Sequence, residues 1–152
     1  MKELKVTPIR NGTVIDHINP GMALKVLRIL KLPKPETRSS ITAALNVPSK
    51  KGGKKDIVKV EDRELDPREV DKIALIAPKA TINIIREYNV AEKHNVRIPQ
   101  NVTGIVRCGN PNCITNQQEP VAPQFSVAAT DPPRLRCHYC DRELQDVAEH
   151  IV

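Results

Sequence analysis

The sequence predicts an α+β protein in which a ferredoxin-like βαββαβ domain precedes a small metal-binding β domain. Extended and helical patterns follow one another in the order strand, helix, strand, strand, helix, strand, which is the split βαβ arrangement. The last third of the chain has no Trp and a single Phe, so it buries too little apolar surface to fold unaided. All four cysteines lie in that last third, in two short pairs.

The first half of the ferredoxin-like domain follows from alternation, one turn and one helical period. Residues 3–9 and 13–18 flank an Asn-Gly turn and mostly alternate apolar and polar side chains, which predicts extended chain. Asn19 and Pro20 suit the N-cap and the first position of a helix. Apolar side chains then recur at helical spacing up to Leu30, and two prolines end the helix.

The second half of this domain contains three more predicted strands and one helix. A capping box begins the helix at Asp66 and Pro78 ends it. A basic loop, Pro-Ser-Lys-Lys-Gly-Gly-Lys-Lys, joins the first two strands; its spacing matches no phosphate-loop signature, which favours a solvated hairpin tip. Residues 88–90 continue the last strand or begin a short edge strand. The predicted strands are residues 39–47, 56–60 and 80–86.

Polar residues 93–99 are predicted to connect the two domains, which we place at residues 1–98 and 99–152. Short strands are predicted in the second domain at residues 102–107, 124–128 and 135–136.

The two cysteine pairs, Cys108-x4-Cys113 and Cys137-x2-Cys140, have the spacing of a zinc site. Two disulfides or four unrelated thiols are the alternatives, but no secretory signal precedes the cysteines, and no cysteine lies elsewhere in the chain to suggest random scatter. His138 lies inside the second pair and could replace one ligand, although four cysteines already complete a tetrahedron. A site filled by four protein ligands leaves no position for an activated water, so we predict one structural Zn²⁺.

Charge is distributed unevenly along a chain whose net charge is +6. Residues 1–55 carry 12 Lys and Arg against 3 Asp and Glu, whereas residues 105–152 carry 4 Arg against 6 Asp and Glu. An anionic ligand is therefore expected at the N-terminal end, and a protein partner at the metal-binding end. The N-terminus lacks the apolar core of a signal peptide and no apolar run could span a bilayer, so we expect a cytoplasmic protein.

Catalytic residues are hard to identify. The cysteines are committed to the metal, and neither His94 nor His150 has an evident partner. Asp16 and His17 are neighbours, but adjacent strand residues point to opposite faces, which argues against a proton relay. The sequence thus predicts a protein without a catalytic site. A metalloenzyme would require an open metal site, and four cysteine ligands argue against one.

Two kinds of binding protein remain open on these grounds. A basic ferredoxin-like domain with a zinc ribbon could bind RNA, but the predicted inner strands have no aromatic side chain on which bases would stack. A compact polyanion such as a nucleotide requires only a few converging lysines beside a backbone edge.

Four segments, taken together and in this order, resemble the regulatory chain of aspartate carbamoyltransferase. They extend over nearly the whole sequence, and their joint pattern is more specific than a zinc frame alone. The segments are residues 12–18 (Gly-Thr-Val-Ile-Asp-His-Ile), residues 55–61 (Lys-Asp-Ile-Val-Lys-Val-Glu), residues 77–83 (Ala-Pro-Lys-Ala-Thr-Ile-Asn) and the cysteine frame of residues 108–140.

The resemblance implies a nucleotide-binding ferredoxin-like domain followed by a rubredoxin-like zinc domain, with no catalytic activity. Chains of this family pair as dimers and bridge two trimers of the catalytic chain, which performs the first committed step of pyrimidine biosynthesis. Nucleoside triphosphates act as effectors: CTP inhibits and ATP usually opposes it.

Carried over position by position, the resemblance also implies an effector site. Lys59 and Lys93 would lie at the phosphates and ribose, meeting at one edge of the sheet, while Tyr88 and Val90 would lie beside the base; Lys55 is a further candidate. Thr7-Pro8 departs from the family pattern of an acidic and a small residue, and Pro8 removes a backbone donor from this region. The implied nucleotide-binding residues are Val6, Ile9, Asp16, His17, Lys59, Asn83, Tyr88, Val90 and Lys93.

Overall fold

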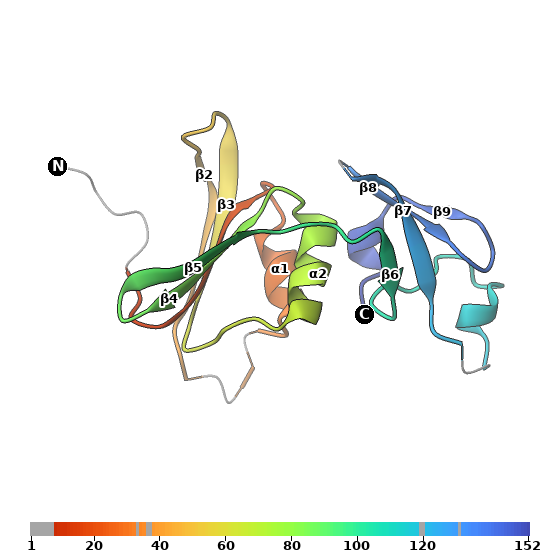
Figure 1. Cartoon of the computed structure of the whole chain (residues 1–152), viewed down its shortest axis with the longest axis horizontal. Helices are drawn as coiled ribbons and strands as arrows, with labels where there is room; N and C mark the ends of the chain where they lie inside the picture. The colour runs from red at the N-terminus through yellow and green to blue at the C-terminus, as the bar shows by residue number, and fades with distance from the viewer. Residues whose placement is uncertain (1–7, 33, 36–37, 119–120, 131) are drawn as a thin grey trace.

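The computed structural model describes residues 8–32, 34–35, 38–118, 121–130 and 132–152. Most of the predicted strand at residues 3–9, including Val6, lies outside the described residues. Figure 1 shows two β-sheets along the long axis of the molecule, with both α-helices between them. The mixed α+β class predicted from the sequence is confirmed.

The N-terminal sheet has five antiparallel strands in the order β2-β3-β1-β4-β5. The first four strands have the ferredoxin-like order, and β5 extends the sheet beyond β4. Helices α1 and α2 cover one face, where their apolar residues pack with Ile15, Val58 and Ile82. The elements are β1 (Gly12–Ile18), α1 (Ala23–Ile29), β2 (Ile41–Pro48), β3 (Lys54–Glu61), α2 (Pro67–Ile76), β4 (Thr81–Arg86) and β5 (Asn89–Asn95).

Helix α2 begins as the sequence predicts. The Asp66 side chain accepts a hydrogen bond from Glu69 N at 2.9 Å, and the Glu69 side chain accepts one from Asp66 N at 3.2 Å. Pro67 occupies the first turn, where its missing N–H has no consequence. This reciprocal cap is complete within four residues, which is why the sequence alone could predict it.

Helix α1 begins three residues later than predicted. Met22, without a side-chain cap, precedes Ala23, and Asn19 O instead accepts the amide of Met22 in a turn. The capping group comes from β3: Asp56 accepts hydrogen bonds from Gly21 N at 2.9 Å and Ala23 N at 3.1 Å. The predicted Asn19–Pro20 start was wrong because a carboxylate remote in sequence competes for these amides.

Two other boundaries also differ from the prediction. Strand β5 runs to Asn95, so Lys93 and its neighbours belong to the sheet and not to a connector. The predicted strand at residues 102–107 is shorter, because Gly104 turns the chain with a φ of +73° after β6. Beyond that turn, Val106 forms an isolated bridge with Ile151.

The C-terminal sheet has four strands in the order β6-β7-β8-β9, and short 3-10 segments flank them. Phe125 is its largest fully buried side chain and packs near Cys108, Cys113 and Cys137. Leu75 of α2 packs into this second core, so the two domains share an apolar contact. The elements are β6 (Asn101–Thr103), η1 (Ile114–Asn116), β7 (Gln124–Thr130), β8 (Pro133–Cys137), β9 (Glu143–Leu144) and η2 (Val147–Glu149).

Replacement of Gly12 by Ala should destabilise the N-terminal sheet. Gly12 has a φ of +142°, and an added Cβ would lie 2.1 Å from Val60 O in the neighbouring strand. Strain and overpacking together predict a loss of about 2 kcal/mol or more in the free energy of unfolding, measured by urea denaturation. Gly52→Ala is the control, because Gly52 has a φ of +98° and open space around it. Equal losses in the two variants would contradict the steric argument.

Candidate functional site

The four cysteines converge at one point of the C-terminal domain. Their Sγ atoms all lie within 4.8 Å of one another, with 3.6 Å between Cys108 and Cys140 and 3.7 Å between Cys113 and Cys137. These distances are far longer than a disulfide bond of about 2.05 Å, and the cysteines are free thiols. Four thiols on two loops in this arrangement can hold a single metal ion.

The loops that carry the cysteines also supply hydrogen-bond donors to sulfur. Asn110 N lies 3.5 Å from Cys108 Sγ, and Tyr139 N lies 3.4 Å from Cys137 Sγ. Thr115 Oγ1 donates to Cys113 Sγ at 3.2 Å. Donors of this kind stabilise thiolates, which are the metal-binding form of cysteine.

Protonation differs among the four thiols because their surroundings differ. Burial raises the pKa of Cys108 to about 12. Burial also opposes ionisation of Cys140, but hydrogen bonds, chiefly from the backbone of Arg142, outweigh it and lower that pKa to about 7. A bound cation would favour the thiolate at every position.

His138 does not belong to the cysteine cluster. Its Nδ1 lies 3.4 Å from Gln124 Oε1, and the side chain is exposed. Within the described part of the chain, the four cysteines form the one group of three or more potential ligands that could hold a metal. The expectation that four cysteines suffice without His138 agrees with this geometry.

A row of polar side chains crosses the helix-free face of the N-terminal sheet. Val14 pairs with Lys59 on one side and with Asn83 on the other, and Asn83 pairs with Lys93. Directly opposed residues in a sheet point to the same face. The flanking Ile15 packs under the helices, so the row points away from them.

The sheet register determines how far apart the two lysines lie. Strands are spaced about 4.8 Å apart, so the backbones of Lys59 and Lys93, on β3 and β5, are separated by roughly 14 Å. They therefore share a face and do not meet at one edge, as the sequence-based argument had supposed. Two lysines whose backbones are this far apart are better placed to contact different parts of an extended anion than to bind one phosphate together.

Asp16 and His17 also lie on this face, Asp16 by regular alternation from Val14 and His17 because of a β-bulge. The pairing of β1 with β3 shifts between Ile15 and Ile18, and His17 has a φ of +57°. Asp16 pairs with Thr81, and the His17 ring reaches Thr81 Oγ1 at 3.2 Å. The prediction that Asp16 and His17 point to opposite faces of the sheet was therefore wrong.

Asp16 is held between two neighbours on this face. Its carboxylate accepts from His17 N at 2.6 Å and forms an ion pair with Lys55 Nζ at 2.9 Å. No local pattern predicted the contact between Thr81 and the His17 ring, because this contact depends on the bulge. Thr81 is buried and also donates to Asn95 Oδ1 at 3.4 Å.

Burial and neighbouring cations keep His17 neutral near pH 7. Burial is the main factor that lowers its pKa from 6.5, and Lys55, Lys51 and Lys93 lower it further, while Asp16 opposes them. A neutral imidazole leaves one ring nitrogen able to accept a hydrogen bond.

Lys59 is the most deeply buried cation of the row, with 6% of its surface exposed. Burial lowers the pKa of its ammonium group, and Glu61 partly opposes this. A partly desolvated ammonium interacts more strongly with an anion than a fully hydrated one does.

The remaining candidates lie toward the β4–β5 turn. Tyr88 and Val90 are exposed, and Val90 pairs with Ile85, two residues along β4 from Asn83. The amide of Tyr88 donates to Arg10 O at 2.9 Å, so it is already used within the chain. Ile9 is buried outside the strands, beside Gly12.

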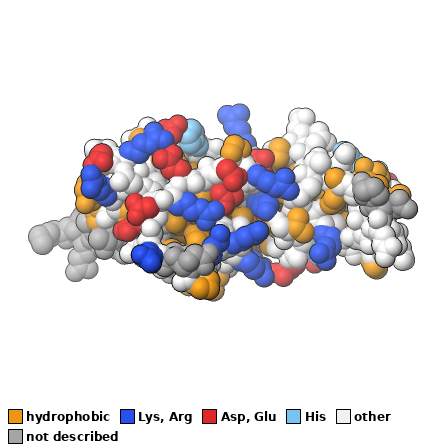
Figure 2. All heavy atoms as spheres, turned by 90° about the horizontal axis from the view of Figure 1, so that it is seen from below, with side chains coloured by type: hydrophobic (Ala, Val, Ile, Leu, Met, Phe, Trp, Pro, Cys, Tyr) orange, Lys and Arg blue, Asp and Glu red, His pale blue; other side chains and the backbone are white. Residues whose placement is uncertain are grey.

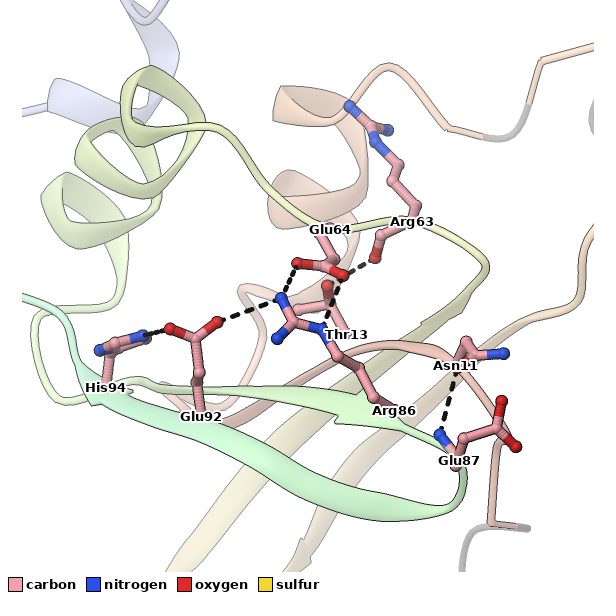
Figure 3. A network of polar contacts seen from close by, with 8 residues as sticks. All are labelled: Asn11, Thr13, Arg63, Glu64, Arg86, Glu87, Glu92 and His94. Atoms are coloured by element: carbon pink, nitrogen blue, oxygen red, sulfur yellow. Dashed lines mark hydrogen bonds and ion pairs between the residues drawn. The ribbon is translucent and has the colours of Figure 1, made fainter.

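The opposite side of β5 carries a polar network that the sequence did not suggest. Arg86 donates to both carboxylate oxygens of Glu64, at 2.8 and 3.2 Å, and contacts Glu92 at 3.3 Å. His94 Nε2 lies 3.7 Å from Glu92 on its other side (Figure 3). The network connects the edge strand to the segment before α2, so β5 carries Lys93 on one face and this network on the other.

Charged side chains are unevenly distributed over the face shown in Figure 2. Lys and Arg, with Asp and Glu among them, lie over the N-terminal and central parts, whereas the far end of the metal-binding domain is mostly uncharged on this face. Neither α-helix among the described residues has the length and apolar character needed to cross a membrane.

Together, the fold and the two sites define a two-domain α+β protein that joins a ferredoxin-like domain to a four-cysteine metal-binding domain. The family model for the allosteric domain of the aspartate carbamoyltransferase regulatory chain matches residues 4–97. The model for the metal binding domain of the same chain matches residues 100–149. The protein belongs to the family of aspartate carbamoyltransferase regulatory chains.

Individual relatives agree with this assignment over nearly their full length. The aspartate carbamoyltransferase regulatory chain of Pyrococcus abyssi is 56% identical over 146 residues, which cover 96% of this chain and 95% of the relative. The regulatory chain of Methanothrix thermoacetophila is 55% identical over 152 residues, covering 99% and 98%. That of Methanothermobacter thermautotrophicus is 56% identical over 143 residues, covering 94% and 90%.

Proposed function

We propose that this chain is a non-catalytic regulatory subunit that binds nucleoside triphosphates and transmits their binding to a catalytic aspartate carbamoyltransferase chain. The row formed by Lys59, Asn83 and Lys93 carries this proposal, because it places two separated cations and an amide on the face of the sheet that the helices do not cover. We also propose that residues 1–98 form the domain that binds the effector and residues 99–152 the domain that contacts the partner.

The effector would lie along this row. Lys59 and Lys93 would contact different phosphates or the ribose region, and the neutral His17 would accept a hydrogen bond from a ribose hydroxyl. Val90 and the backbone carbonyl group of Tyr88 would lie beside the base. CTP as inhibitor and ATP as its opponent are the effectors that the family suggests.

Zinc is the metal that best fits the cysteine cluster. A Zn–S bond of about 2.3 Å in a tetrahedron separates sulfurs by about 3.8 Å. The Sγ atoms of Cys108 and Cys140 lie 3.6 Å apart and those of Cys113 and Cys137 lie 3.7 Å apart, both close to that value. Thiolate ligands also suit zinc better than magnesium or calcium, which prefer oxygen. With all ligands supplied by the protein, the ion would hold the fold together and supply no reactive water.

The metal-binding domain would hold the catalytic chain. Ile114 directly follows Cys113, and Tyr139 lies between Cys137 and Cys140; they are 44% and 45% exposed, although both have large apolar surfaces. Exposed apolar side chains on loops that a metal makes rigid suit a protein interface. We also propose pairing of two regulatory chains, in a cytoplasmic assembly that serves pyrimidine biosynthesis.

Calorimetric titration of the full-length, zinc-loaded chain with CTP and with ATP tests this function. Saturable binding of at least one nucleotide is expected, and the chain alone should not form carbamoyl aspartate. The RNA-binding alternative predicts salt-dependent retention on a polynucleotide instead. The five strands of the N-terminal sheet contain no Phe, Tyr or Trp, which leaves that alternative without aromatic side chains in the sheet on which bases could stack. Polynucleotide binding without nucleotide binding would overturn the proposal.

A further inference from the structure

Asp56 is a fully buried carboxylate that takes no part in the proposed effector site. Its Oδ1 accepts the amide of Asn46 at 2.8 Å, and its Oδ2 accepts the amides of Gly21 at 2.9 Å and Ala23 at 3.1 Å. A buried carboxylate is strongly unfavourable unless such donors surround it. Asp56 thereby fixes the start of α1 to strand β3 and to the bulge of β2.

Asp56 lies on the same strand as Lys55 and Lys59 but points to the opposite face of the sheet. Strand residues alternate between faces, so Asp56 points toward the helices while its neighbour Lys55 and, further along, Lys59 point toward the proposed effector. A displacement of the β2–β3 hairpin would therefore move the group that holds the first turn of α1. The Asp56 carboxylate accepts from the amides of Gly21 and Ala23 directly, so its short side chain is the whole connection between the strand and the start of α1.

Helix α1 contacts the C-terminal tail of the metal-binding domain. Lys25 Nζ lies 2.8 Å from Glu149 Oε1, an ion pair between residues of different domains. Ala148 and Ile151 pack against the apolar cluster that includes Val26 of α1. The ion pair is partly exposed, so it contributes little alone, but the apolar contacts act at the same place.

The tail is in turn bound to the chain that enters the metal site. Arg107 N donates to His150 O at 2.7 Å, and Val152 N donates to Ile105 O at 3.0 Å. Cys108, a predicted metal ligand, follows Arg107 directly. Packed side chains and hydrogen bonds thus form an unbroken series from β3 to the metal-binding loop.

We propose that Asp56 makes α1 the connection through which effector binding on β3 alters the tail and the metal-binding loop. This coupling rests on the proposed function, since it presupposes a nucleotide on the Lys59 face. Contiguity alone does not establish coupling, so a measurement at both ends of the series is required. Asp56 is in this sense a positioning residue that does not touch the effector.

Asp56→Asn in the full-length, zinc-loaded chain tests the coupling. The amide keeps the size of the carboxylate but turns one acceptor into a donor that faces backbone N–H groups. The readout is hydrogen exchange of residues 104–108 and 146–152 with and without saturating CTP, alongside calorimetric affinity. CTP should change exchange there about fivefold or more in the wild type. Asp56→Asn should abolish that change while CTP affinity stays within about threefold of wild type.

Two further variants keep the test decisive. Asp62→Asn is the matched control, because Asp62 is an exposed acid just beyond the end of β3 and should leave the response unchanged. Lys25→Met with Ile151→Ala removes the ion pair together with an apolar contact of the tail, and it should reduce the response even if Asp56→Asn does not fold. An undiminished response in this variant would overturn the coupling.

The outcomes also separate the coupling from the proposed function. Nucleotide binding with no exchange response in the wild type, or a wild-type response in Asp56→Asn, would overturn the coupling and leave the effector site standing. Failure of the wild type to bind CTP or ATP would overturn both.

Discussion

Removal of the metal is expected to unfold the C-terminal domain while the N-terminal sheet stays folded. A structural zinc contributes on the order of 10 kcal/mol of apparent folding free energy, which the small core around Phe125 cannot replace. The N-terminal sheet has its own core under α1 and α2 and needs no metal. In a folded domain without the ion, only weak S–H interactions would hold the four thiols close together.

Hydrogen exchange after treatment with a chelator measures this effect domain by domain. Amides of the β7–β8 ladder should lose protection, whereas amides of the β1–β3 ladder should keep it. Cys113→Ser should have the same effect, while Thr115→Val, which removes one donor to the same sulfur, should cost only about 1 kcal/mol. Lower pH should also favour metal loss, because protons compete for the thiolates. A chelated protein that keeps protection in both ladders would contradict a structural metal.

Lys59→Met is expected to weaken triphosphate binding by roughly tenfold to a hundredfold. A charge-assisted hydrogen bond contributes about 1.5–3 kcal/mol, and burial of Lys59, which lowers the pKa of its ammonium group, weakens the hydration that competes with an anion. The methionine side chain fills similar space without charge. The fold should therefore persist, and the loss should appear in the affinity for the effector.

Calorimetry with a nucleoside triphosphate and with the corresponding free nucleoside separates the phosphate contact from other effects. The triphosphate should bind Lys59→Met much more weakly, whereas the weak affinity for the nucleoside should be unchanged. Lys54→Met is the matched control, since Lys54 lies at the exposed start of the same strand. Equal triphosphate affinity in wild type and Lys59→Met would refute the site.

Local patterns were sufficient for much of the fold. The capping box of α2 lies within four residues, and turn and periodicity signals placed most strands and both helices. The cysteine spacing identified the metal cluster because two short loops can present sulfur in few other ways. The same signals failed at the start of α1, where the capping carboxylate of Asp56 is 33 residues from the amide of Ala23.

The sequence by itself determined the α+β class, the order of its strands and helices and the four cysteines of the metal cluster, because each depends on residues near one another in the chain. Only the tertiary structure decided that Lys59, Asn83 and Lys93 form one row, since their alignment depends on the register of four strands. It also decided that His17 joins Asp16 on that face. A single extra residue in a bulge reverses the side to which a strand residue points, and long-range pairing decides where that residue lies.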